Sequence, residues 1–97
     1  MNRPSAQISV QTNLNLLGLT VKDQVTGYKG VVTSICFDLY GCVQAIINPG
    51  TDKDGKLSEQ AWFDINRLKI VSETLVMPRP NFDFEKGSAE KPIPHKA

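Results

Sequence analysis

The sequence has few of the residues that carry out catalysis. Its 97 residues include one histidine, His95, which lies in a stretch punctuated by prolines. A general acid or base must be held in a pocket beside the substrate, and a proline-punctuated segment offers no such pocket. Without His95 the chain cannot assemble a Ser-His-Asp or Cys-His nucleophile. We therefore predict that the protein is not an enzyme.

The sequence is also poor in metal ligands. A structural zinc ion needs four ligands, and the two cysteines, Cys36 and Cys42, have no histidine near them in the sequence. A cross-strand disulfide is one alternative, but cytosolic thiols mostly stay reduced, so we predict that both serve as small, buried or half-buried hydrophobes. An acidic motif beginning at Asp52 lacks the glycine that a calcium loop requires at its sixth position. We expect a tight hairpin turn there, with no metal and no cofactor.

Neither an excess of one charge nor a long apolar run is present. Eleven Lys and Arg face ten Asp and Glu, which gives a net charge of +1. A strongly basic chain would favour nucleic acid through its phosphates, so this balance makes nucleic acid an unfavoured partner. No run is long enough to cross a membrane, and no signal-peptide pattern opens the sequence. We expect no membrane association and a cytoplasmic location.

What the sequence does contain is a series of short β-prone segments with turn residues between them. Such segments, rich in β-branched and aromatic side chains, favour strands, and Gly, Pro and Asp-Gly pairs favour turns. Short strands at this spacing predict an all-β fold. For a folded unit of roughly 60 residues, a five-stranded barrel closes the sheet edges economically. The expected strands are residues 20–25, 31–40, 42–48, 59–64 and 68–71.

The segments flanking these strands differ in composition. We predict a flexible N-terminal segment at residues 1–15, a barrel at 16–72 and an extended, Pro-containing C-terminal tail at 73–97. A barrel this small buries little apolar surface, so a partner or self-association is expected to support it. In the tail, Phe82 and Phe84 are two residues apart, so an extended chain presents both on one side. That segment either docks on a sheet edge or is disordered.

The order of these pieces resembles a known family. Residues 21–33, VKDQVTGYKGVVT, resemble the opening of SH3-like barrels of the KOW and Tudor kind, in which a strand enters a Gly-bounded turn and a Val-rich strand follows. The basic cluster of a nucleic-acid-binding KOW module is reduced here to Lys22 and Lys29. The whole of residues 19–72 is similar to short, mostly uncharacterised proteins of bacteriophages, prophages and other mobile elements. The pieces that carry this resemblance are Gly41-Cys42-Val43-Gln44, Pro49, Asp54-Gly55-Lys56, Trp62-Phe63-Asp64 and Arg67-Leu68.

The resemblance implies a five-stranded SH3-like barrel and an origin in a phage or mobile element. It implies no activity, because a shared fold does not determine function.

Aromatic and polar residues near the turns are the candidate binding residues. Alternation places Trp62 and Phe63 on opposite faces of their strand. If Phe63 fills the core, Trp62 either anchors a binding surface, as interface tryptophans do, or covers the end of the barrel. Arg67 either holds a carboxylate or phosphate bidentately or forms a surface pair with Asp64. The remaining candidates are Tyr28, Lys29, Tyr40 and Gln44.

These features favour a non-enzymatic interaction module of a phage or mobile element that binds a protein partner or copies of itself. It would act as a virion component or as a modulator of a host system. One alternative is an oligomeric protein that sequesters a small ligand or nucleotide between its copies. A weaker alternative is a nucleic-acid-binding barrel.

Overall fold

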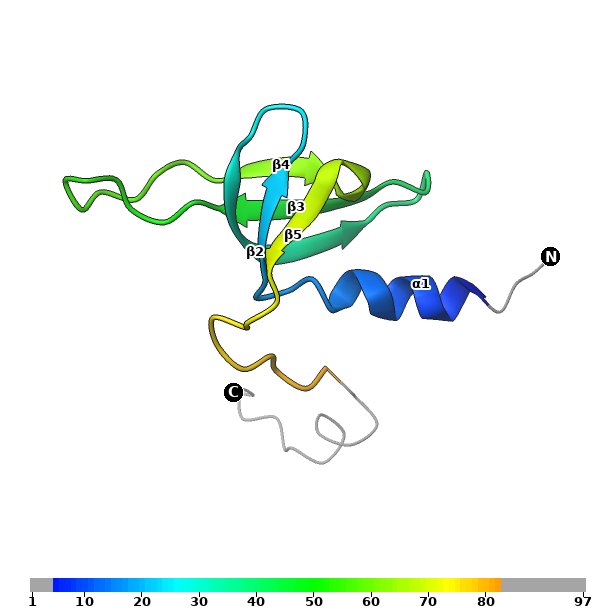
Figure 1. The fold of residues 1–97 in the computed structure, drawn as a ribbon. Helices are drawn as coiled ribbons and strands as arrows, with labels where there is room; N and C mark the ends of the chain where they lie inside the picture. The colour runs from blue at the N-terminus through cyan, green and yellow to red at the C-terminus, as the bar shows by residue number, and fades with distance from the viewer. Residues whose placement is uncertain (1–4, 83–97) are drawn as a thin grey trace, which may run out of the picture.

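A computed structural model describes residues 5–82, with side chains from residue 10 onward. Its five strands form one antiparallel sheet in the order β4-β3-β2-β1-β5 (Figure 1). The sheet curls over itself, and a single turn of 3-10 helix, η1 (Ile65–Arg67), joins the last two strands. The predicted all-β fold class, built on five strands, is therefore confirmed. The strands are β1 (Thr20–Asp23), β2 (Lys29–Phe37), β3 (Val43–Asn48), β4 (Ala61–Asp64) and β5 (Leu68–Ser72).

Two glycines allow the strands to turn and approach one another. Gly27 has a φ of 84° in the turn between β1 and β2, a conformation that costs other residues strain. Gly30 lies where β2 crosses close to β3, and a Cβ atom there would come within 2.4 Å of the Asn48 carbonyl oxygen. A side chain at residue 30 would therefore push the two strands apart. β2 also carries a register shift between Val32 and Ser34, which bends the strand around the core.

The core is small and lies between the two halves of the curled sheet. Val21, Val32, Ala45 and Ile47 are fully buried and come from β1, β2 and β3. Buried positions alternate along each strand, at residues 21 and 23 of β1, 30 and 32 of β2, and 45 and 47 of β3, as a sheet with one buried face requires. Seven partly buried side chains surround this cluster: Leu16, Leu17, Tyr28, Ile35, Phe63, Ile65 and Leu68.

The N-terminal segment differs from the flexible stretch expected for residues 1–15. The helix α1 (Ser5–Leu14) forms there and runs alongside the barrel (Figure 1). Its ten residues include no Gly and no Pro, so nothing interrupts the ladder of local backbone hydrogen bonds. Residues near position 8 have a weak β tendency but no neighbouring strand to pair with, so their backbone groups bond within the helix instead.

The described part of the C-terminal tail, residues 73–82, is an extended strap held against the chain that precedes β1. The Val76 N–H donates to the Gly18 carbonyl at 3.0 Å. The Arg79 guanidinium donates to the carbonyls of Leu17 at 3.0 Å and Asn15 at 2.8 Å. These carbonyls lie just beyond the end of α1 and accept no hydrogen bond from a helical N–H group. The Arg79 cation therefore bonds them favourably.

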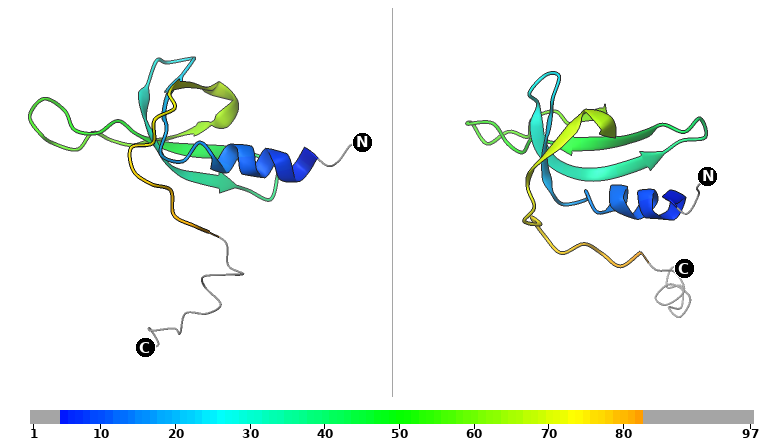
Figure 2. Two further views of the ribbon diagram at one scale, coloured as in Figure 1. Left: turned by 60° about the horizontal axis from the view of Figure 1, so that its bottom comes forward. Right: turned by 45° about the vertical axis from the view of Figure 1, so that its right-hand side comes forward.

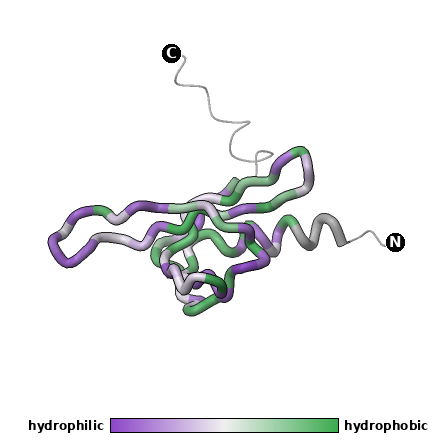
Figure 3. The backbone as a smooth tube through the Cα atoms, turned by 90° about the horizontal axis from the view of Figure 1, so that it is seen from above, coloured by the Kyte–Doolittle hydropathy of each residue, from purple (hydrophilic) through white to green (hydrophobic). Residues whose placement is uncertain are grey.

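Two loops project from opposite sides of the barrel (Figures 1 and 2). One is the turn between β2 and β3, which we call the hairpin tip (residues 37–42). The other is the long connection between β3 and β4 (residues 49–60). Coloured by hydropathy, the long connection is mostly hydrophilic, whereas the hairpin end is mostly hydrophobic (Figure 3).

Candidate functional site

An ion pair ties the end of β1 to η1; its carboxylate is buried, whereas the side chain of its cation is 39% exposed. Asp23 is completely buried, and its two carboxylate oxygens accept hydrogen bonds from Nε and Nη2 of Arg67, both at 2.7 Å. Oδ2 also accepts from the Thr26 backbone N–H at 2.8 Å and from the Thr26 hydroxyl at 2.5 Å. The Arg67 guanidinium, aided by these Thr26 bonds, holds the pKa of Asp23 well below its ordinary value, despite burial. Arg67 therefore binds a carboxylate bidentately, but this carboxylate belongs to the chain itself and not to a ligand.

This pairing answers the question of what Arg67 binds. Asp64, the surface partner considered from the sequence, instead accepts a hydrogen bond from the Asn66 N–H at 2.9 Å and caps η1. The sequence did carry a signal for Asp23. It lies two residues after Val21 in the same strand, so alternation places it on the buried face.

Two aromatic rings complete the cluster around Arg67. Its guanidinium carbon lies 5.3 Å from the centre of the Phe63 ring, and the centres of the Phe63 and Tyr28 rings are 5.2 Å apart. The Tyr28 hydroxyl donates to the backbone carbonyl of Glu59. Tyr28 and Arg67 are thus bonded to other parts of the chain, Tyr28 to the β3–β4 connection and Arg67 to β1.

Trp62 and Gln44 lie on the opposite, outer face of the sheet. Gln44 is paired with Asp64, and Trp62 with Ile46, so the two side chains are diagonal neighbours across β3 and β4. Phe63 packs on the core, while Trp62 is 50% exposed. Two of the predicted binding residues therefore share a surface, separate from Tyr28 and Arg67.

Tyr40 lies at the hairpin tip, together with two other exposed hydrophobic residues. Phe37 is 44% exposed, Leu39 91% and Tyr40 87%. The Asp38 carboxylate shapes this turn by accepting hydrogen bonds from the N–H groups of Tyr40 and Cys42, each at 2.9 Å. The tip is therefore an ordered turn that displays apolar side chains to solvent.

Both cysteines are free and exposed, and the prediction that they are buried or half-buried hydrophobes is wrong. Cys36 is paired with Gln44 and so lies on the outer face of the sheet. Cys42 lies in the turn itself. The cause is the register of β2 and β3, which local sequence does not reveal.

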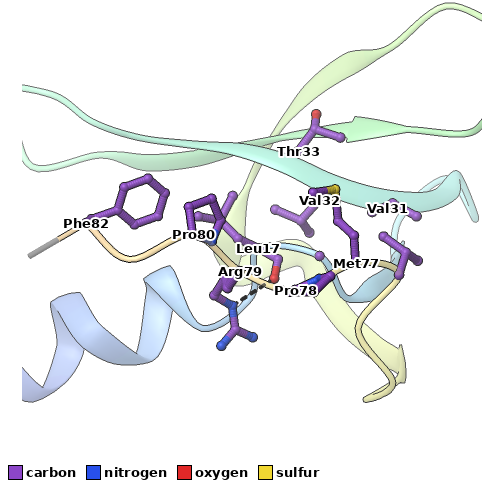
Figure 4. A pocket seen from close by; sticks show the side chains of 11 residues that line it. Leu17, Val31, Val32, Thr33, Met77, Pro78, Arg79, Pro80 and Phe82 are labelled. Carbon is purple, nitrogen blue, oxygen red and sulfur yellow. Dashed lines mark hydrogen bonds between the residues drawn. The ribbon is translucent and has the colours of Figure 1, made fainter. Parts of the chain in front are cut away.

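The strap and β2 enclose an apolar groove of about 330 Å³ (Figure 4). Arg79 turns its guanidinium toward the Leu17 carbonyl, away from β2. Phe82, predicted to dock, lies at one end of this groove and remains 53% exposed. Phe84, its predicted companion, and His95 lie outside the described residues. The groove is lined by Leu17, Gly18, Val31, Val32, Thr33, Val76, Met77, Pro78, Arg79, Pro80 and Phe82.

Lys29, the last predicted site residue, begins β2 and is exposed. It lies directly opposite Lys22 of β1 and so shares the outer face with it. The described candidate residues thus divide among five places, which are the cluster around Asp23, the outer face of β3 and β4, the hairpin tip, the start of β2 and the groove under the strap.

Within residues 5–82, no three His, Cys, Asp or Glu side chains converge as a metal site would need. Over the same residues no helix has the length and apolar character to cross a bilayer. A scan against models of protein families, a search of curated proteins and a search of solved structures each find no match.

Proposed function

We propose that the chain is a non-enzymatic interaction module of a bacteriophage or another mobile element, and that it binds a protein through the hairpin tip. The observation that carries the proposal is the exposure of Phe37, Leu39 and Tyr40 on one projecting turn. Apolar groups gathered on the surface of a small protein mark sites of protein contact. Tyrosine is also enriched among the residues that dominate binding energy. The partner is another protein or a second copy of this chain.

The charge distribution supports the same surface. Residues 33–43 include one charged side chain, Asp38, and its carboxylate is bonded back into the turn. A partner that covers the tip therefore displaces water from apolar groups without stripping a free charge of its hydration. Covering the tip is favourable because most of what it buries is hydrocarbon.

The mobile-element origin is taken from the resemblance of residues 19–72, and it implies a place of action in the host cytoplasm or in the virion. The alternative of a nucleotide-sequestering oligomer has less support, because its pocket needs Tyr28 and Arg67. The Arg67 guanidinium is already bonded to Asp23, and the Tyr28 hydroxyl to the Glu59 carbonyl.

A pair of matched substitutions tests the proposal. Leu39→Ser removes an apolar side chain from the hairpin tip, and Leu57→Ser makes the same change at an exposed leucine in the β3–β4 connection. Losing the burial of one leucine weakens binding by about 1.5–3 kcal/mol, which is at least about tenfold in Kd. We expect that loss for Leu39→Ser and little change for Leu57→Ser.

The measurement has two parts. Sedimentation velocity over a range of concentrations reports self-association, and a photo-reactive group at position 39 in expressing cells captures a heterologous partner for affinity measurement. A protein that stays monomeric and yields no cross-linked partner from position 39 contradicts the proposal. Equal losses in the two serine variants contradict it as well.

A further inference from the structure

Three lysines from three strands lie in one row on the outer face of the barrel. Lys22 of β1 is directly opposite Lys29 of β2 on one side and Lys69 of β5 on the other. Residues paired across antiparallel strands share a face, and all three side chains are exposed. With neighbouring strands about 4.8 Å apart, the row spans roughly 10 Å. We call these three residues the lysine row.

No lysine of the row forms an ion pair with another described residue. The one ion pair between described side chains joins Arg67 to Asp23. Asp23 follows Lys22 in β1, but its carboxylate lies on the buried face and is held by Arg67. Like charges placed directly opposite in a sheet repel each other. The free protein therefore carries an unfavourable arrangement that a bound polyanion would relieve.

We infer that the lysine row binds the phosphodiester backbone of a nucleic acid, without reading its base sequence. Lysine ammonium groups contact phosphate as point charges, and a nucleic acid presents closely spaced phosphates over the length of such a row. An acidic protein partner is a poorer fit, because lysine is depleted from protein–protein interfaces. The overall charge of only +1 makes this local row, rather than the whole chain, the source of attraction.

The lysine row and the hairpin tip are far enough apart for two ligands to bind the chain at the same time. Lys29 begins β2 and Phe37 ends it, and a nine-residue strand is roughly 25 Å long. A protein held at the tip and a nucleic acid held at the row would not collide. The inference does not depend on the hairpin tip, since the row stands on its own residues.

The test measures how binding depends on salt. Fluorescence anisotropy follows binding of a labelled 20-base-pair duplex DNA, and separately of a single-stranded RNA of equal length, at salt concentrations from 25 to 200 mM. The slope of log K against log salt is negative. Each change of one lysine of the row to glutamine should make it shallower, by about 0.9 on duplex DNA or about 0.7 on a single strand. Binding of either probe with these losses supports the inference, and the larger affinity identifies the preferred nucleic acid.

The matched control is Lys53→Gln, which removes the same charge from the exposed β3–β4 connection. It should leave the slope nearly unchanged, and thermal unfolding should show that Lys22→Gln and Lys69→Gln remain folded. The inference is overturned if Lys53→Gln reduces binding as much as Lys22→Gln does. It is equally overturned if neither probe binds at 25 mM salt, or if poly-glutamate binds as tightly as the nucleic acids.

Discussion

Lys22 and Asp23 are neighbours in the chain, yet they lie in opposite electrostatic surroundings. Asp23 faces the interior, is fully buried and has both oxygens bonded to Arg67 and Thr26. Lys22 faces solvent between two other lysines and has no carboxylate partner among the described residues. A buried charge must be completely bonded because burial removes its hydration. An exposed charge keeps its hydration and stays available to a ligand.

The largest effect is expected from breaking the buried side of this comparison. Asp23→Asn places an amide N–H₂ where one oxygen now accepts N–H groups of Arg67 or Thr26. The substitution sets an N–H₂ group at a buried position against other donors and removes the counter-charge of Arg67. It should therefore lower the free energy of unfolding more than the other substitutions described below. Urea denaturation measures the loss. An exposed control, Asp54→Asn, should be nearly neutral, and similar midpoints for the two variants would argue against a structural role of the ion pair.

The next effect concerns pH. The pKa of Asp23 in the folded chain is depressed far below its ordinary value of 3.8 because of the bond with Arg67. The stability that this carboxylate contributes is therefore complete above about pH 5 and is lost progressively as the pH falls through 4 and below. Thermal unfolding between pH 6 and pH 2 should show the loss. Asp23→Asn should flatten the curve, and an unchanged curve in that variant would assign the acid sensitivity to other groups.

A smaller effect is expected from the ring beside the ion pair. Phe63→Leu keeps an apolar side chain in the core but removes the ring that contacts Arg67 and Tyr28. We expect a loss of about 1–2 kcal/mol in the free energy of unfolding. The double variant with Tyr28→Leu should lose less than the sum of the single changes, since the two rings share a contact. Strict additivity would show that the pair contributes nothing of its own.

The smallest effect lies on the exposed side of the comparison and has the opposite sign. Lys22→Gln relieves repulsion from Lys29 and Lys69, so it should raise the free energy of unfolding by a few tenths of a kcal/mol at low salt. The gain should vanish at 1 M salt, where the charges are screened. Thermal unfolding of the parent chain and of Lys22→Gln, at low salt and at 1 M salt, measures this difference. A destabilised variant at low salt would mean that Lys22 has a favourable partner.

Local signals accounted for much of the fold and for part of the candidate site. The Gly-bounded turn after β1 and the Pro-Gly pair after β3 are visible in the sequence, and they mark where these strands end. The opposite orientation of Trp62 and Phe63 also follows from alternation. The predicted strand over residues 31–40 is too long at its end, because Asp38 bonds the following backbone N–H groups and begins the turn.

The exposure of Cys36, the partner of Arg67 and the helix α1 were not foreseen. Each of these features depends on residues that are distant in the sequence. Cys36 depends on register, Arg67 on a strand 44 residues away in the chain, and α1 on having no strand to pair with. Residue composition alone cannot separate these outcomes.

The sequence by itself determined that the chain is an all-β barrel with about five strands, since alternation and turn residues act over a few neighbouring positions. Only the tertiary structure decided which side chains meet. It brought Arg67 to the buried carboxylate of Asp23 and aligned Lys29, Lys22 and Lys69 on the outer face. The physical reason is that strand order and register bring together residues from distant parts of the chain. No local pattern encodes that pairing.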